Sequence, residues 1–171
     1  MAGVILETRV VGDAAIRAFT QLALHVTNTQ PIMAAIGTAL VENVHQRFER
    51  ASGPGGAAWA PLNPVYASGK KGPGILRESG MRGGLMGSIT RRAGHDYVEV
   101  GTNKIYGAIH QFGGVIQPKS SDRLYFKMGG KMVGANSVTI PARPYLGIDH
   151  EDEQVILETL VDAIDRAIGL G

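Results

Sequence analysis

A dense run of glycine and proline interrupts this chain of 171 residues between positions 52 and 74. Four prolines and six glycines fall in these 23 positions, so neither a helix nor a central strand is expected there. Irregular segments of this length are generally functional or disordered, and we predict a mobile arm that becomes ordered on docking. Trp59 and Leu62 are its expected anchors. The tryptophan either fills the chain's own core or docks on a partner.

Amphipathic helices are predicted on both sides of this segment. Apolar residues recur every three or four positions over 14–26 and again over 32–50, where Pro31 marks the start. Asp149 is a good N-cap for a third helix, because three acidic residues follow in the first turn and the apolar spacing continues to Gly169.

Short strands are predicted in the remaining parts of the chain. Period-two alternation indicates an antiparallel pair over 88–92 and 97–102, and the Gly129-Gly130 turn indicates a hairpin. The other expected elements are strands at 4–11, 124–127, 131–133 and 137–140, a helical turn at 75–78, and a short helix at 105–112 closed by Gly113-Gly114. Because strands and helices do not alternate as βαβ, the order predicts a single α+β domain over residues 1–171, with helices packed on one face of an antiparallel sheet.

Composition limits the class of protein further. Hydrophobic residues make up 44% and charged residues 19% of the chain, which excludes a disordered protein. The absence of cysteine excludes disulfides, thiol nucleophiles and thiolate metal sites. No run of 18 apolar residues occurs, and the N-terminal segment lacks the basic region of a secretory signal. We therefore expect no membrane partner.

The charges are unevenly distributed. Residues 50–92 hold seven bases and one acid, whereas residues 149–171 hold seven acids and one base. Three interpretations remain open: both regions are simply solvated, they meet within the fold or between neighbouring copies, or the basic region contacts DNA phosphates. Only Trp59 and Tyr66 lie among the bases, which gives little support to recognition of nucleic acid by stacking.

Motifs of catalysis are missing. The sequence has no nucleophile elbow, no Walker A motif, no dinucleotide-binding fingerprint after a strand and no His-Glu-x-x-His zinc motif. We predict no catalytic, cofactor-binding or metal-ligating residues. His110 is the one candidate for catalysis, but no nucleophile or carboxylate lies near it in sequence. A buried histidine that ties loops together by hydrogen bonds is the favoured interpretation.

Four groups of short motifs follow one another between residues 59 and 152. They are WAPLNP at 59–64, ILRESG at 75–80 with LMGSI at 85–89, VEVGT at 98–102 with YGAIHQFGG at 106–114, and IPARPYLG at 140–147 followed by Asp149 and Asp152. In this order they resemble the phage virion morphogenesis family, the tail-completion proteins of contractile-tailed and Mu-like phages. The chain departs from the pattern by the extra residues 81–84, which affect the local loop.

This resemblance implies a non-enzymatic structural protein that acts in tail completion and head–tail joining, as an oligomeric ring. Its implied partners are further copies of the chain and other phage tail or connector proteins, together with non-specific contact with packaged DNA. Its implied location is the virion, at the head–tail junction or tail end, and the host cytoplasm during assembly. The predicted interaction residues are Trp59, Leu62, Tyr106, His110, Gln111, Phe112, Arg143, Pro144 and Tyr145.

Arg143 is the most specific of these predictions. Prolines at 141 and 144 fix the backbone near it, and its forked guanidinium suits a carboxylate. We expect it to pair with an acid of the last helix, Asp149 or Asp152, on the same or a neighbouring chain. Two other functions stay open, namely a small hydrolase-like processing factor that uses His110 and a basic DNA-binding accessory protein.

Overall fold

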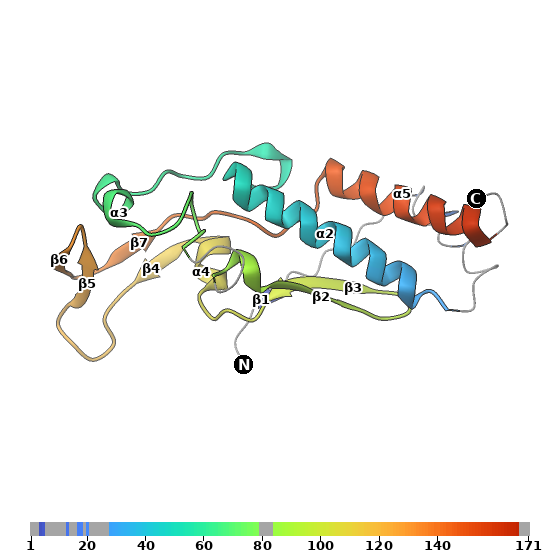
Figure 1. The fold of residues 1–171 in the computed structure, drawn as a ribbon. Coiled ribbons are helices and arrows are strands. Elements are labelled where there is room, and N and C mark those ends of the chain that lie inside the picture. Colours follow the sequence, from blue (N-terminus) through green and yellow to red (C-terminus); the bar gives the residue numbers. More distant parts are fainter. Residues whose placement is uncertain are drawn as a thin grey trace.

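The computed structural model describes residues 28–78 and 84–167, with Val4–Ile5 and positions 13, 17, 18 and 20 (Figure 1). Most of the helix predicted over 14–26, most of the strand predicted over 4–11 and nearly all of the extra residues 81–84 lie outside the described residues. The described backbone of Val4–Ile5 forms strand β1, which pairs with residues 101–102.

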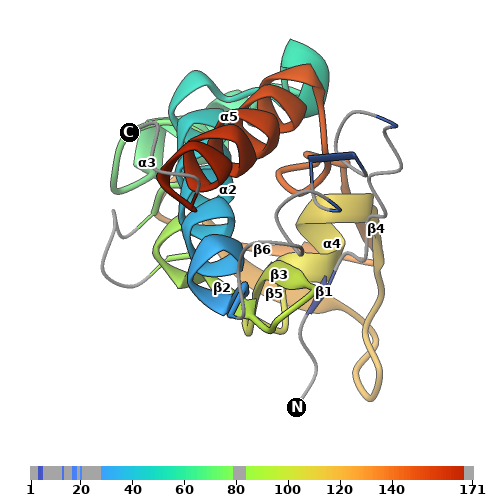
Figure 2. The same ribbon diagram turned by 90° about the vertical axis from the view of Figure 1, so that its right-hand side faces the viewer.

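Two long helices and a small sheet form the body of the molecule. The sheet has the antiparallel order β1-β3-β2, built with β2 (Ile89–Ala93) and β3 (Val98–Thr102). Helix α2 (Gln30–Arg50) covers one face of it, and α5 (His150–Ala167) packs on α2 on the side away from the sheet (Figure 2). The predictions for both helices and for the strand pair are confirmed.

The apolar stripe of α2 explains this layering. Ile36, Leu40 and Val44 point into the core as their four-residue spacing predicts. Gly37 lets the sheet come close, because a Cβ there would lie 2.6 Å from Val98 Cγ2. On the other side, Leu160 of α5 is 1% exposed and joins the Ile36 and Leu40 side chains in one apolar cluster.

The segment 52–74 contains more regular structure than its composition predicts. It forms a 3-10 turn, η1 (Pro54–Gly56), and a short helix, α3 (Pro64–Gly69). The prediction of no helix was therefore wrong, and the reason is local: Pro64 stands in the first turn, where its missing N–H costs nothing, and the Asn63 side chain caps the helix by accepting hydrogen bonds from Val65 N and Tyr66 N. The helical turn expected at 75–78 is also wrong, because Leu76 adopts a left-handed φ of 58°.

The remaining elements are a short helix, two small antiparallel ribbons and a 3-10 turn. Helix α4 (Gly107–Phe112) ends at Gly113, which has a φ of 71°, as predicted. Strand β4 (Gly114–Ile116) pairs with β7 (Val138–Ile140), and β5 (Leu124–Met128) pairs with β6 (Lys131–Ala135) as the predicted hairpin. A further 3-10 turn, η3 (Met86–Ser88), precedes β2.

The α+β class is confirmed, but the arrangement differs from the expected one. The described strands form three separate antiparallel sheets instead of one, and α5 packs on α2 instead of on a sheet. The β4–β7 ribbon and the β5–β6 hairpin extend away from the body, opposite the end to which α5 points (Figure 1).

Candidate functional site

An aromatic anchor holds the glycine- and proline-rich segment to the end of α2. Trp59 is 6% exposed and lies edge-on to Phe48, with ring centroids 5.4 Å apart. Its indole Nε1 donates to Pro144 O at 2.8 Å. Of the two roles considered for this tryptophan, filling the core or docking on a partner, the structure shows the first, because the side chain packs in the chain's own core.

Arg143 fastens the other side of the same segment. It is 6% exposed, and its Nε donates to Ala60 O at 2.9 Å while Nη2 donates to Pro61 O at 3.0 Å. The predicted pairing of Arg143 with Asp149 or Asp152 is wrong within the chain. Two backbone carbonyls of the irregular segment take the place of the carboxylate.

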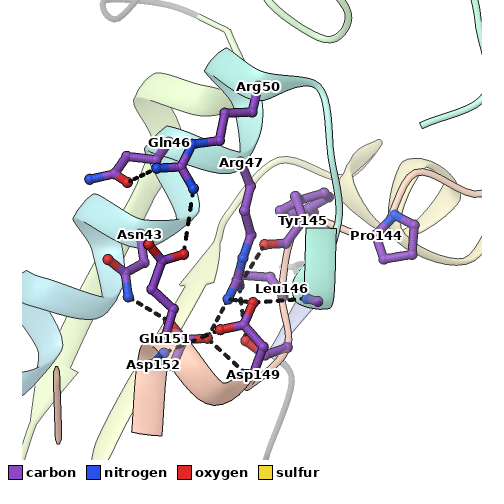
Figure 3. A network of polar contacts seen from close by, with 12 residues as sticks. Asn43, Gln46, Arg47, Arg50, Pro144, Tyr145, Leu146, Asp149, Glu151 and Asp152 are labelled. Atoms are coloured by element: carbon purple, nitrogen blue, oxygen red, sulfur yellow. Dashed lines mark hydrogen bonds and ion pairs between the residues drawn. The ribbon is translucent and has the colours of Figure 1, made fainter. Parts of the chain in front are cut away.

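The cation that meets those acids is Arg47 (Figure 3). Its Nη2 pairs with Asp149 at 3.0 Å and with Asp152, and Asn43 Nδ2 donates to Asp152 Oδ1 at 2.8 Å. Arg47 is 6% exposed and Asp152 is 1% exposed, so the pair is buried. We call Asn43, Arg47, Asp149 and Asp152 the Arg47 network. A sequence signal existed, because Arg47 stands on the apolar stripe of α2 and a buried cation needs a partner.

The Arg47 network also starts α5 and holds η1. Asp149 Oδ1 accepts from Asp152 N at 3.2 Å, and Asp152 Oδ2 accepts from Asp149 N at 3.1 Å, which is a reciprocal cap of the helix start. Asp149 Oδ2 further accepts from Gly55 N at 2.9 Å. Gly55 has a φ of 72°, a conformation that favours glycine. One carboxylate thus connects α2, η1 and α5.

Asp149 should make the protein sensitive to acid. Burial alone would raise its pKa, but hydrogen bonds from the amides of Gly55 and Asp152 and the charge of Arg47 outweigh burial and lower the pKa. A lowered pKa stabilises the fold above the unfolded value of about 3.9, and this stabilisation is lost as the pH falls through the folded value. We expect urea midpoints to fall as the pH drops below the unfolded value, and to fall less in Asp149→Asn. The control Asp122→Asn, at an exposed position, should keep the wild-type profile; equal profiles for all three would contradict this.

Gln111 joins α4 to the segment that precedes α5. It is 5% exposed, its Oε1 accepts from Tyr145 N and Leu146 N at 3.0 Å each, and its Nε2 donates to Leu146 O at 2.8 Å. Burial raises the pKa of Tyr145 to about 12, so its hydroxyl stays protonated and donates to Gly107 O at 3.1 Å. These side chains fix the path of the backbone between the two elements.

His110 ties the same segments together through its backbone. Its carbonyl accepts from Arg143 N at 2.7 Å, but its Nδ1 is buried without a partner among the described residues. Burial, followed by the charge of Arg143, lowers the pKa of His110 and favours the neutral ring. Within the described chain no carboxylate or hydroxyl is hydrogen-bonded to this imidazole, and no group of three residues that could hold a metal occurs. His110 therefore ties loops together by a hydrogen bond, as expected, but through its backbone carbonyl, and its side chain is half-buried.

The match with known proteins covers this whole arrangement. The model of the phage virion morphogenesis family matches residues 10–165. The chain belongs to this family. In this member of the virion morphogenesis family, the motifs around Trp59, His110 and Arg143 contain the residues that join the irregular segment, α4 and the segment before α5.

Two curated relatives come from Mu and a Mu-like prophage. “Putative capsid assembly protein G” of Escherichia phage Mu is 32% identical over 155 residues, covering 86% of this chain and 90% of the Mu protein. “Mu-like prophage FluMu G protein 2” of Haemophilus influenzae is 32% identical over 145 residues, covering 85% of each chain. No solved structure matches the chain. The family membership supports a role in phage structure or assembly.

The predicted interaction residues of this family member divide into three groups by burial. Four are buried and hold the fold together: Trp59, Gln111, Arg143 and Tyr145. Leu62 and His110 are half-buried, and the exposed ones are Tyr106, Phe112 and Pro144. The exposed residues stay predicted contacts. Phe112 is 63% exposed, and it lies next to a larger apolar surface that the sequence reasoning missed.

That surface belongs to what we call the distal arm, residues 114–140. No residue of the distal arm is buried, although all of it is described. Its large exposed apolar side chains are Val115, Ile116, Tyr125 and Met132. Two-stranded ribbons are marginally stable alone, and exposed apolar patches mark interaction sites. The available sequence signal was the alternation of Leu124, Phe126 and Met128 with Tyr125 and Lys127, which is typical of a strand with one exposed face.

Three of the bases of residues 50–92 lie on different elements and are paired with acids. Arg50 lies on α2, Lys70 after α3 and Arg92 on β2, and each has an acidic partner in Glu151, Glu78 or Glu99. The basic and acidic regions therefore meet within the fold at the Arg50–Glu151 pair, whose Nη1–Oε2 distance is 3.5 Å. In the described part of the chain no helix has the length and apolar character to span a membrane.

Proposed function

We propose that this protein acts without catalysis in tail completion and head–tail joining, as an oligomeric ring at the head–tail junction or tail end of the virion. The observation that carries the proposal is the distal arm, which exposes apolar side chains and has no core of its own. In a chain of the virion morphogenesis family, such an arm is suited to contacts with further copies and with tail or connector proteins.

The body of the molecule suits the same role. The Arg47 network, the Trp59 anchor and the Gln111 contacts fix the base of the arm to α2 and α5. A rigid base lets the arm present its side chains with little loss of conformational entropy on docking. A docking role for the irregular segment 52–74 itself then falls on its exposed α3, which contacts β5 of the arm.

A phage that lacks this protein provides the test. During its growth in the host we expect DNA-filled heads and separate tails, which join and become infectious when purified protein is added to the lysate. Normal infectious particles without the protein would overturn the proposal. Absent or misshapen heads would instead support a second function, capsid assembly, which the name of the Mu relative favours.

The double variant Phe112→Ala/Val115→Ala, which we call the arm variant, changes one residue at the base of the distal arm and one in its first strand, and it should separate assembly from folding. Both side chains are more than half exposed, so their loss should change the free energy of unfolding by less than about 0.5 kcal/mol. We expect the yield of joined particles in the complementation assay to fall at least about tenfold, as removal of about 1.4 kcal/mol of contact energy implies. The control Tyr97→Ala removes another exposed aromatic ring, at the β2–β3 turn, and should complement fully. A wild-type yield from the arm variant would show that this surface is not a contact.

A further inference from the structure

One face of the β5–β6 hairpin combines apolar and basic side chains. Tyr125 and Lys127 lie two residues apart on β5, and Met132 is the cross-strand partner of Lys127, so all three share a face. All three are exposed, and the tyrosine and methionine are each about two-thirds exposed. The exposed base Arg123 lies beside this face, because a Cβ at Gly134, the cross-strand partner of Tyr125, would be 3.6 Å from Arg123 Cδ. Lys131 pairs with Met128 and lies on the other face. The distal arm as a whole carries four bases and one acid, a net charge of +3.

The outer face of α5 has the opposite character. Glu158, Val161 and Asp162 are spaced by three and four residues, so they lie on one side of the helix, and all three are exposed. Leu160 and its apolar neighbours occupy the opposite side, against α2. Among the described residues no cation pairs with the carboxylates of Glu158 or Asp162. The α5 face thus has an exposed valine flanked by acids, whereas the hairpin face has tyrosine and methionine flanked by bases. The two faces are complementary in charge.

The two surfaces cannot meet within one molecule. The hairpin lies at one end of the elongated chain and α5 runs toward the other (Figure 1). Each chain therefore carries one half of a complementary contact at each end. A contact between unlike surfaces is head-to-tail, and it closes into a ring when the rotation between subunits allows.

We propose that the hairpin face Tyr125, Lys127, Met132 docks on the α5 face Glu158, Val161, Asp162 of a second copy of this chain. The apolar side chains are buried against one another, and the ion pairs around them fix the register. This inference rests on the proposed ring and specifies its subunit contact. It also gives the acidic region of the sequence a role between neighbouring copies.

Charge reversal tests the contact. We expect Arg123→Glu/Lys127→Glu and Glu158→Lys/Asp162→Lys each to remain monomeric by sedimentation velocity under conditions in which the wild type forms oligomers. An equimolar mixture of the two variants should oligomerise again. The acidic hairpin of the first variant then meets the basic α5 of the second, and the unchanged hairpin of the second meets the unchanged α5 of the first. The matched control Glu42→Lys/Glu49→Lys, at exposed positions of α2, changes the charge equally and should oligomerise like the wild type.

Cysteine cross-linking tests proximity directly, because the chain has no cysteine of its own. The double variant Met132→Cys/Val161→Cys should form a ladder of oligomers with a short bismaleimide, whereas mixed single variants should stop at dimers. Ile105→Cys/Val161→Cys, with the first site at another exposed apolar position, should give no ladder.

The outcomes separate this contact from the proposed function. Oligomers of both reversal variants, or no rescue in the mixture, would overturn the contact and leave the ring proposal standing. A wild type that stays monomeric at every accessible concentration would overturn self-docking and leave another virion protein as the occupant. Normal particles from the phage without this protein would overturn the proposed function, whatever the mixtures give.

Discussion

Replacing Arg47 with alanine is expected to lower the free energy of unfolding by about 3–5 kcal/mol, the usual cost of removing one partner of a buried ion pair. The change leaves Asp152, which is 1% exposed, with an uncompensated charge. It also removes donors to Gly147 O and Tyr145 O, at 3.0 and 3.4 Å. Urea denaturation followed by fluorescence of the single tryptophan, Trp59, measures the loss, because this residue is buried beside Phe48.

The neighbouring Arg50 supplies the control. Its pair with Glu151 joins two side chains that are more than half exposed, and Arg50→Ala should cost at most about 1 kcal/mol. The double variant Arg47→Ala/Asp152→Asn should recover part of the loss, since it removes the stranded charge together with the cation. A cost below about 1 kcal/mol for Arg47→Ala would mean that the network contributes no more than an exposed pair does.

Replacing Trp59 with alanine should cost a similar amount, about 3–5 kcal/mol. The variant loses the edge-on contact with Phe48 and the hydrogen bond to Pro144 O, and it leaves a cavity at the end of α2. Because the chain has no other tryptophan, circular dichroism replaces fluorescence as the readout.

Two variants separate the causes of this loss. Trp59→Phe keeps an aromatic ring but has no donor for Pro144 O, so it should cost less than the alanine variant. Ile105→Ala, at a position that is 76% exposed, should change stability by less than about 0.5 kcal/mol. If Trp59→Ala folded with wild-type stability and failed only in particle assembly, the residue would be a docking anchor, and its role in the core would be wrong.

Trp59, Arg143 and Asp149 explain why the segment 52–74 is held in place despite its composition. Trp59 and Arg143 fasten it to the strand-like path at 141–146, and Asp149 accepts from Gly55 N in η1. The glycines allow the turns that these contacts need. These contacts fix the path of the segment to the body of the molecule.

The candidate site was predictable only in part. The sequence indicated Trp59, Gln111 and Arg143 as interaction residues, and it left open whether Trp59 fills the core. It did not indicate that Gln111 and Arg143 are buried and join distant segments, nor that exposed apolar side chains lie on the distal arm. Burial depends on which segments cover a residue, and three of the covering segments are more than thirty positions away in the chain.

The sequence by itself determined the local elements: α2, α5, the β2–β3 pair and the β5–β6 hairpin follow from periodicity, caps and turn residues, which act over a few neighbouring positions. Only the tertiary structure decided the long-range pairings. It joined β4 to β7, gave Arg143 two backbone carbonyls, and gave the acids at the start of α5 to Arg47, about a hundred positions away. Several cations could have met those acids, and the choice was made by the apolar stripe of α2, whose packing against α5 carries Arg47 into the same buried space.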